Sequence, residues 1–201
     1  MRGVLFWLTA PWLASGCDEV LQLSPRVPDV GGDAAFDPEQ CPSTYSALLP
    51  GQPSRYRLKT TAAPMWSHSD DCDNDRTGGT HLAALDDMNE ITAAQGYLDM
   101  VAGQPYDRTW VGAVQRSTAD TPDDAWITVA GGDLPAYWCP PTEPNDGGSQ
   151  VENGVEQFAL MRFKERCFTD APGLDQAGAL CECDGKPSAT DATELIDFYR
   201  P

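Results

Sequence analysis

Seven cysteines constrain the fold of this 201-residue chain more than any other feature, because a disulfide forms only between segments that lie side by side. Cys17 follows an apolar N-terminal stretch, and the other six are Cys41, Cys72, Cys139, Cys167, Cys181 and Cys183. In an oxidising compartment an even number of cysteines indicates disulfides throughout, but many pairings stay open. Whether the chain is exported therefore decides what the cysteines do.

The N-terminus has the features of an export signal. A positively charged start, Met1-Arg2, is followed by a largely apolar stretch that is too short to span a bilayer. The next residues, LASGC, resemble a bacterial lipobox, in which small residues precede the cysteine that receives lipid. We expect residues 1–16 to be a lipoprotein-type signal peptide and Cys17 to be lipidated. The protein is then exported and lipid-anchored to the bacterial cell envelope, or secreted if Cys17 is not lipidated.

Composition divides the rest of the chain into a tether, a domain and a tail. Residues 17–40 contain proline, glycine and acidic residues with little apolar periodicity, which is typical of a flexible tether. Residues 41–184 are expected to form the folded domain. Residues 185–201 are a C-terminal tail, in which DATELIDFYRP forms either a short helix capped by Asp191 or a loose end.

The charge of the chain excludes two classes of partner. Asp and Glu number 31 against 13 Lys and Arg, which gives a net charge of −18. Such a surface repels the phosphates of nucleic acids and anionic lipid head groups. We therefore expect no nucleic-acid partner, and contact with a membrane only through the lipid anchor.

Periodicity predicts a mixture of helices and strands. Strands are predicted at residues 54–60, 109–114, 155–163 and 178–184, and helices at residues 65–72 and 81–101. Residues 117–154 show no regular pattern, although Trp126, Tyr137 and Trp138 lie within them. An irregular segment of this length that contains aromatic residues is typical of an ordered functional loop.

Several short motifs follow one another in an order that resembles a known family. They are MWSHSDDC, HLAALDDMNE, WVGA, Trp126, Trp138, EPN at 143–145, a glutamate before a strand, FTD at 168–170 and LCE at 180–182. Together they resemble a C-type lectin-like domain that covers Cys41 to Asp184. The resemblance implies an α+β fold: two helices pack on antiparallel strands, the terminal strands pair, and a long loop carries the ligand site. The three tryptophans Trp110, Trp126 and Trp138 are then core residues.

The same resemblance implies how the cysteines pair. Cys72 with Cys181 matches the disulfide that spans the whole domain, Cys41 and Cys183 then lie on the paired terminal strands, and Cys139 with Cys167 ties the two ends of the long loop. Phe158 and Gly173 stand where the family commonly has its loop-side cysteine pair, so we expect the Cys139–Cys167 bridge to substitute for it.

The EPN motif is where the resemblance implies a calcium site. In the family the proline is cis and both flanking side chains, here Glu143 and Asn145, bind the metal. Glu156 and Asp170 match the two further ligands, although Glu152 is an alternative to Glu156. Calcium takes six to eight oxygen ligands, so positions remain for two sugar hydroxyls that also bond to Glu143, Asn145 and Glu156. An EPN motif goes with mannose, glucose or fucose-type sugars in that family.

One family ligand is replaced in this chain. The family's asparagine before the last aspartate is Thr169, which offers a weaker neutral oxygen, so we expect weakened calcium binding. We therefore carry two functions forward: a surface-anchored, calcium-dependent carbohydrate-binding lipoprotein, and a calcium-independent adhesion or assembly module of the same fold that contacts surface proteins.

Other metal sites are weaker hypotheses. DDCDND resembles the start of an EF-hand, but Arg76 takes the glycine position and Leu82 the position of the closing glutamate. His68, Cys72 and His81 do not form a zinc site if Cys72 has a disulfide partner. We expect Asp120, Asp123, Asp124 and Asp146 to form an exposed acidic loop rather than an auxiliary calcium site.

The sequence does not indicate an enzyme. Both histidines lie in the predicted helical region, and no G-x-S-x-G nucleophile elbow is present. Carboxylate pairs such as Glu143 and Glu156 do occur in glycosidases. In this context we interpret them as metal ligands.

Overall fold

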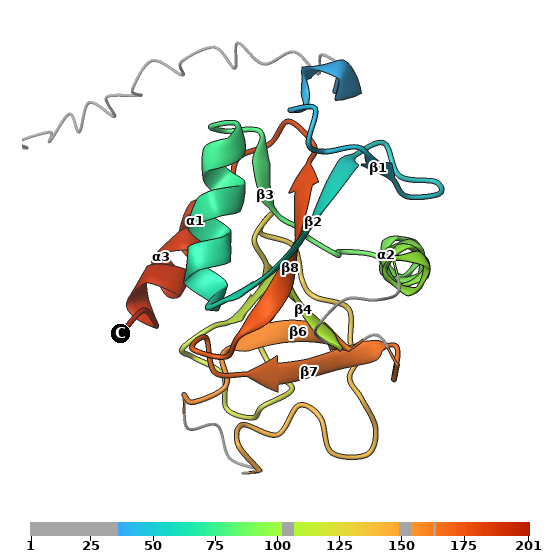
Figure 1. Cartoon of the computed structure of the whole chain (residues 1–201). Helices are drawn as coiled ribbons and strands as arrows, with labels where there is room; N and C mark the ends of the chain where they lie inside the picture. The colour runs from blue at the N-terminus through green and yellow to red at the C-terminus, as the bar shows by residue number, and fades with distance from the viewer. Residues whose placement is uncertain (1–35, 102–106, 149–153, 163) are drawn as a thin grey trace, which may run out of the picture. The chain divides into compact units, whose positions relative to one another are not determined.

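A mixed β-sheet and three α-helices make up the described part of the chain (Figure 1). The structure is a computed structural model that describes residues 36–101, 107–148, 154–162 and 164–201. The strands are β1 (Ala47–Leu48), β2 (Arg55–Ala63), β3 (Thr80–Leu82), β4 (Arg108–Gln115), β5 (Trp126–Thr128), β6 (Phe158–Arg162), β7 (Cys167–Ala171) and β8 (Ala177–Cys183). The helices are α1 (Met65–Asp75), α2 (Met88–Met100), α3 (Thr190–Phe198) and the short 3-10 helix η1 (Pro38–Gln40). The expected signal peptide (residues 1–16), Cys17 and Glu152 lie outside the described residues.

The sheet joins the two ends of the domain. Its strand order is β1-β2-β8-β4-β6-β7, with β3 added on β8 and β5 on β4. β2 and β8 pair antiparallel, so that Tyr56 lies opposite Glu182, whereas β4 and β8 run parallel. β7 has only one strand beside it on this path, and its outer edge is where the long loop begins. The terminal strands pair as the resemblance implies.

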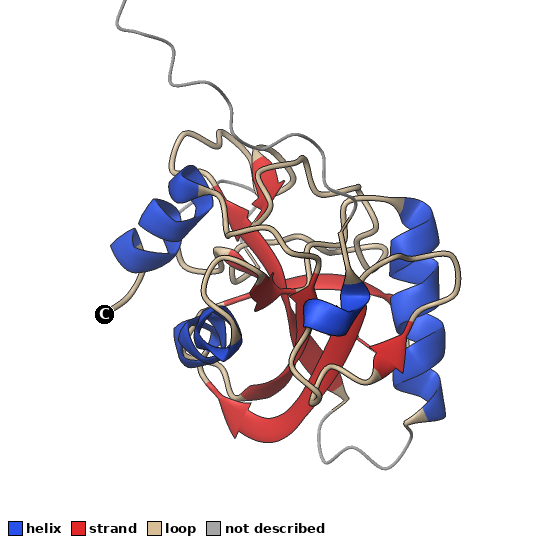
Figure 2. Ribbon diagram, turned by 90° about the horizontal axis from the view of Figure 1, so that it is seen from above, coloured by secondary structure: helices blue, strands red, loops and turns tan. Residues whose placement is uncertain are grey.

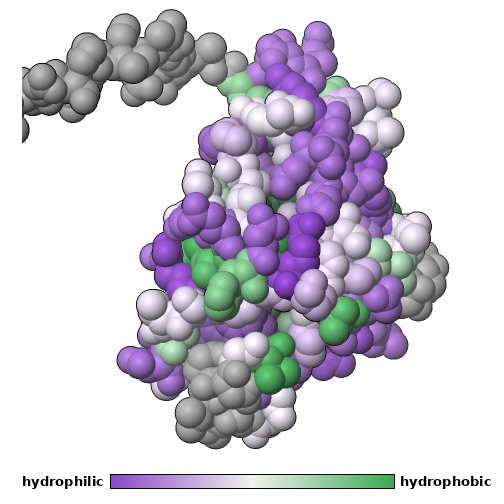
Figure 3. Space-filling view, turned by 90° about the vertical axis from the view of Figure 1, so that its left-hand side faces the viewer, coloured by the Kyte–Doolittle hydropathy of each residue, from purple (hydrophilic) through white to green (hydrophobic). Residues whose placement is uncertain are grey.

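Both faces of the sheet are buried, which explains the alternation along its strands. On β6, Phe158 and Leu160 belong to one hydrophobic cluster, and Ala159 and Met161 belong to the other. Helices α1 and α3 cover the first face, and α2 covers the second (Figures 1 and 2). The face that carries α1 and α3 is mainly hydrophilic, with apolar residues in small separate patches (Figure 3). Within the described residues no helix is long and apolar enough to span a membrane.

The second predicted helix was too long. Residues 81–101 were expected to be helical, but His81 and Leu82 belong to β3 and pair with β8, and α2 begins only at Met88. The reason is the side chain of Asp87, which accepts hydrogen bonds from Asn89 N (2.7 Å) and Glu90 N (2.9 Å) and so caps the helix. Strands β5 and β7 were not predicted either, because each is short and flanked by turn residues.

The C-terminal segment forms a helix rather than a loose end. Helix α3 buries Ala192 and Ile196 in the same cluster as the first face of the sheet. The expected cap was wrong, since the N-cap residue is Ala189. Asp191 lies inside the first turn, where its carboxylate forms a 2.9 Å ion pair with Arg116. Residues 185–201 therefore contribute to the core.

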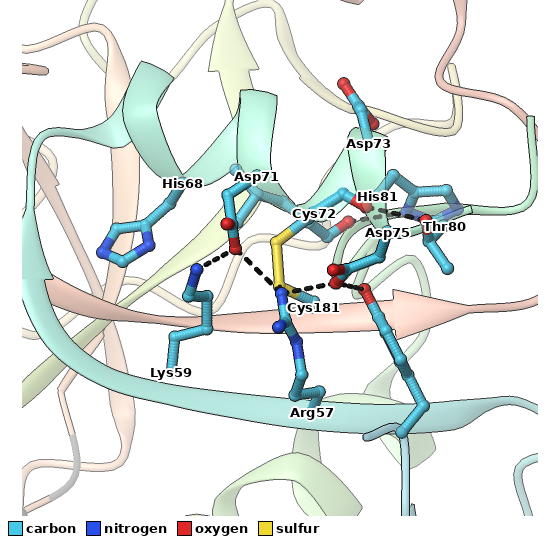
Figure 4. Close-up of a disulfide and its surroundings, with 12 residues drawn as sticks. Arg57, Lys59, His68, Asp71, Cys72, Asp73, Asp75, Thr80, His81 and Cys181 are labelled. Carbon is cyan, nitrogen blue, oxygen red and sulfur yellow. Dashed lines mark hydrogen bonds and ion pairs between the residues drawn. A yellow bond between two sulfur atoms is a disulfide. The ribbon is translucent and has the colours of Figure 1, made fainter. Parts of the chain in front are cut away.

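All three disulfides implied by the resemblance are present. The Cα–Cα distances are 5.9 Å for Cys41–Cys183, 5.6 Å for Cys72–Cys181 and 4.9 Å for Cys139–Cys167. The second bridge fastens α1 to β8 and is surrounded by ion pairs from Arg57 and Lys59 to aspartates of α1 (Figure 4). The ring of His68 points instead to Ala177 O, at 3.0 Å, so the rejected zinc hypothesis gains no support from its geometry.

Two glycines mark close approaches that only a residue without Cβ allows. A Cβ on Gly112, in the WVGA motif, would lie 2.5 Å from a Val129 methyl carbon and 2.6 Å from Leu82 O. A Cβ on Gly173 would lie 2.6 Å from the ring of Phe158. The two positions at which the family commonly has a disulfide are thus in contact here, with an aromatic ring filling the space.

A buried acidic cluster links α2 to the sheet. The Tyr56 hydroxyl lies 2.5 Å from Glu90 Oε1 and 3.3 Å from Glu182 Oε1, and Ala84 N donates to Glu182 Oε2 at 3.0 Å. Burial and the charge of Glu182 raise the pKa of Glu90 to about 8. Burial also lowers the pKa of the neighbouring His81, but its hydrogen bond to Asp184 and the nearby carboxylates outweigh this effect and raise the pKa to about 9. Glu90 therefore retains a proton at neutral pH.

We predict that Glu90→Gln flattens the dependence of stability on pH. The folded protein holds a proton on Glu90 up to about pH 8, whereas the unfolded chain releases it near 4.5, so the free energy of unfolding falls as the pH rises through this window. Removing the titrating group should reduce this slope by up to about 1.4 kcal/mol per pH unit. Urea unfolding across the window measures it, with Glu194→Gln on an exposed face of α3 as the control. Parallel profiles for wild type and Glu90→Gln would contradict the assignment.

Candidate functional site

Residues 137–139 of the long loop run beside the outer edge of β7 and pair with it through backbone hydrogen bonds. Phe168 N donates to Tyr137 O (2.8 Å), and Cys139 N donates to Phe168 O (2.9 Å). The Cys139–Cys167 disulfide fixes the same register covalently. Trp138 packs on Trp126, with ring centroids 4.7 Å apart, and on Phe168 at 6.0 Å. This edge places the EPN motif next to the second half of β7.

The Asp170 carboxylate organises the EPN turn. Its Oδ2 atom accepts hydrogen bonds from Asn145 N (2.9 Å) and Asp146 N (2.7 Å). The Glu143–Pro144 peptide bond is cis, as the resemblance implied. The Asn145 side chain donates to Glu143 Oε2 at 2.6 Å, so the two residues that flank the proline face each other.

Asp146 closes the other side of the turn. Its side chain is 1% exposed, and Oδ1 accepts hydrogen bonds from Val155 N and Glu156 N, both at 3.1 Å. The backbone of Asp146 has a positive φ of 46°, which aspartate tolerates better than most residues. Its grouping with an exposed acidic loop was therefore wrong, although Asp120, Asp123 and Asp124 are exposed. An aspartate followed directly by two glycines is a turn signal that could have identified it.

The structure brings the four expected ligand residues together. Glu143, Asn145 and Asp170 are joined by the hydrogen bonds above, and the Glu156 carboxylate accepts from Gly147 N, two residues beyond Asn145. Asn145 Oδ1 accepts from Gly148 N. The turn thus uses several of its own backbone N–H groups to satisfy oxygens that the resemblance assigns to a metal.

The electrostatics of the site show crowded carboxylates. Burial and the neighbouring Asp170 carboxylate raise the pKa of Glu143 to about 7, although the nearby Thr169 and the hydrogen bond from Asn145 act in the opposite direction. Burial and the charges of Asp170 and Asp146 also raise the pKa of Glu156. Asp170 Oδ1 is buried and has no hydrogen-bond donor among the described residues. Each of these features is what a cation at this point would relieve.

These oxygens fit a hard cation, although they are not gathered around one point. Among the described residues, no group of three or more His, Cys, Asp and Glu side chains is arranged to hold a metal ion. The donors present are carboxylate and amide oxygens, which are the ligands that calcium prefers. The donorless Asp170 Oδ1 and the Glu143 carboxyl beside it are the two groups best placed to begin such a site.

Comparison with known proteins identifies the fold. No protein-family model and no curated protein sequence matches the chain. Solved structures do match: the C-type lectin CEL-I from Cucumaria echinata has 17% identity, covers 71% of this chain and 96% of its own, and gives a TM-score of 0.57. A calcium-independent type II antifreeze protein has 20% identity, with 77% and 98% covered and a TM-score of 0.54. SPL-1 in complex with GlcNAc has 12% identity, with 73% and 97% covered and a TM-score of 0.55.

The chain has the C-type lectin-like fold. Identities at this level establish the architecture and no more. None of the three matched structures is named as an enzyme, and two are named as a lectin or as a complex with a sugar. The function of the loop must therefore be argued from its own side chains.

We predict that Asp146→Ala destabilises the folded protein by about 1–3 kcal/mol, because two backbone N–H groups lose their acceptor. Asp146→Asn keeps an oxygen at the acceptor position and also tolerates a positive φ, so its loss should be smaller. Chemical denaturation of both variants measures the difference. Equal stability of Asp146→Ala and wild type would show that Asp146 does not hold the turn.

Proposed function

We propose that the protein binds carbohydrate through a calcium ion held by Glu143, Asn145, Glu156 and Asp170. The observation that carries this proposal is the pairing of Glu143 with Asp170: a carboxyl whose pKa is raised to about 7 beside a buried carboxylate oxygen that has no hydrogen-bond donor among the described residues. The sugar-bound state of one structural neighbour, SPL-1 with GlcNAc, supports a carbohydrate ligand for this fold.

The residues would divide the work as follows. Calcium supplies positive charge and open coordination positions for two neighbouring hydroxyls. The carboxylates of Glu143 and Glu156 accept hydrogen bonds from those hydroxyls, and the Asn145 amide donates one. A donor on one side and acceptors on the other give the site a direction. The resemblance of the EPN motif to that of the family supports mannose, glucose or fucose-type sugars. Asp170 holds the turn through Asn145 N and Asp146 N, and its second oxygen, which has no donor among the described residues, would be available to bind the ion.

A second function of another class has its own supporting observation. The loop satisfies Asn145 Oδ1 and the Glu156 carboxylate with backbone N–H groups of Gly148 and Gly147, so the turn can hold its shape without an ion. Thr169 in place of asparagine also removes one candidate ligand. The competing proposal is a calcium-independent adhesion or assembly module that contacts surface proteins.

We predict that calcium raises the thermal stability of the protein and that Glu143→Gln or Asp170→Asn lowers calcium affinity by about tenfold or more, since each removes a negative ligand. A site saturated to about 100 times its Kd would add about 2.7 kcal/mol to the free energy of unfolding. Calorimetric titration and melting curves with and without calcium measure both effects. Retention on a mannan column should be lost on adding a chelator.

The control for this experiment is Asp123→Asn, which removes an equal charge from an exposed part of the loop region. It should bind calcium as the wild type does. A protein that shows no calcium-dependent shift and binds no sugar on an array contradicts the calcium proposal. That outcome favours the protein-binding module.

We further propose that the N-terminal signal is removed and that Cys17 anchors the protein to the bacterial envelope. This proposal is supported by the LASGC sequence and the apolar stretch before it.

We predict that Cys17→Ser moves the protein from the membrane fraction to the soluble fraction of the producing bacterium. Cys41→Ser is not a suitable control because it breaks a disulfide, so Ser24→Ala in the expected tether serves instead. An unchanged membrane fraction for Cys17→Ser would overturn the lipid anchor.

A further inference from the structure

A cleft next to the EPN loop is lined by two arginines, whereas the loop itself offers carboxylate and amide oxygens. Its volume is about 380 Å³, within the range of small-molecule sites, and its lining residues are Asp107, Arg108, Arg162 and Thr169. From this lining we infer that the saccharide bound at the loop carries an anionic group, a carboxylate or a sulfate ester, which Arg108 and Arg162 receive. The inference rests on the proposed function and names the class of its ligand.

The two arginines are held side by side by the sheet. Arg108 on β4 and Arg162 on β6 are direct partners in the antiparallel register, so their side chains leave the same face at neighbouring positions. Like charges directly opposite one another are unfavourable unless an anion lies between or near them. Three of the five residues from Arg162 to Arg166 are basic, in a chain with 31 acidic and 13 basic residues. Basic residues are therefore concentrated in this part of the sequence, although Arg108 and Arg162 each have a carboxylate partner.

The present partners of the two arginines are easily displaced. Arg108 Nη1 lies 2.8 Å from Asp175, whose side chain is 34% exposed, and Arg162 Nη2 lies 2.9 Å from Glu165, whose side chain is 41% exposed. Ion pairs that solvent reaches in this way contribute little to stability. Each pair uses one terminal nitrogen, and a guanidinium has five N–H donors in a planar fork that matches carboxylate and sulfate oxygens.

Thr169 connects the cleft to the candidate calcium site. It lines the cleft and lies near enough to Glu143, the first residue of the EPN motif, to lower its pKa, while its hydroxyl donates to Asp170 O at 3.3 Å. Asp170, the residue that organises the turn, follows it directly on β7. A sugar whose hydroxyls lie at Glu143 and Asn145 can therefore extend a substituent over Thr169 toward the arginines. The position that lacks the family's asparagine is thus the wall between two parts of one binding surface.

The mixed lining favours an acidic sugar over a free anion or an acidic protein. Asp107 offers an acceptor that a sugar hydroxyl can use and that would repel a second negative charge. The chain's charge of −18 also repels strongly acidic macromolecules at a distance. At physiological ionic strength fields beyond about 8 Å are largely screened, so a single anionic group that reaches the cleft is recognised by the arginines alone.

The experiment compares three probes that differ only at one carbon: surface-displayed glucose, glucuronate and glucose 6-sulfate, each with the full chain in calcium. We expect at least one anionic probe to bind about tenfold more tightly than glucose, because charge-assisted hydrogen bonds to arginine add to the same hydroxyl contacts. The preferred probe distinguishes a carboxylate from a sulfate ligand. Arg108→Gln and Arg162→Gln should each lower the affinity for the anionic probe toward the affinity for glucose. The affinity for glucose itself should stay unchanged.

The matched control is Arg116→Gln, since Arg116 also forms a 2.9 Å ion pair with a partly exposed aspartate but lies outside the cleft lining. The Arg116→Gln variant should still bind the anionic probe more tightly than glucose, to the same extent as the wild type. Arg162→Lys keeps the positive charge but lacks the planar guanidinium group, so its affinity for the anionic probe should fall about threefold. Melting curves verify that each variant is folded. Equal or tighter binding of glucose overturns this inference and leaves the proposed function standing. Binding of none of the three probes also overturns this inference, and the calcium titration and sugar array then decide the proposed function separately.

Discussion

The interaction on which the site depends is the contact of the Asp170 carboxylate with the backbone of the EPN turn. Oδ2 receives two N–H groups, from Asn145 and Asp146, while Oδ1 is buried without a donor among the described residues. Hydrogen bonds to a carboxylate are about twice as strong as neutral ones, so one side chain on an edge strand can fix a turn that has no regular structure of its own. Asp146 then holds the far end of the turn through Val155 N and Glu156 N. The loop is defined by two aspartates rather than by apolar packing.

These two contacts work only because the sheet beneath them is rigid. β6 is buried on both faces, with Phe158 and Leu160 in one cluster and Ala159 and Met161 in the other. Such two-sided burial leaves β7 little freedom to move relative to its neighbour. The Cys139–Cys167 bridge then ties the start of the loop to β7 over 28 positions of the chain, which stabilises the folded state by about 3–4 kcal/mol in the chain-entropy view. The packed core therefore holds the edge strand β7 in place, and β7 in turn holds the loop.

Much of this arrangement could be predicted because it depends on spacing along the chain. The alternating strand at residues 55–63 and the paired cysteines follow from local pattern and from the family resemblance. The start of α2 could not be predicted from apolar periodicity, because Leu82 and Leu85 are buried by the sheet and not by a helix. The place of Asp146 and the roles of the two arginines depend on which strands become neighbours. Nothing in the local sequence around Arg108 indicates that Arg162 lies opposite it.

A cation at this loop would replace a proton rather than enter a preformed cage. Burial and the neighbouring Asp170 carboxylate raise the pKa of Glu143 to about 7, so the Glu143 carboxyl carries a proton below about neutral pH. Binding through Asn145 Oδ1 or Glu156 Oε2 would also compete with the hydrogen bonds that these atoms accept from Gly148 N and Gly147 N. Each such exchange costs about 0.5–1.5 kcal/mol, because a hydrogen bond within the protein is traded against water. These costs are small beside the attraction of a divalent ion for three carboxylates, but together with the loss of one ligand at Thr169 they would give the proposed calcium site a moderate affinity. Under the proposed function, the loop would exchange a calcium ion readily, and the arginine-lined cleft beside it would add contacts to a ligand that the ion alone holds weakly.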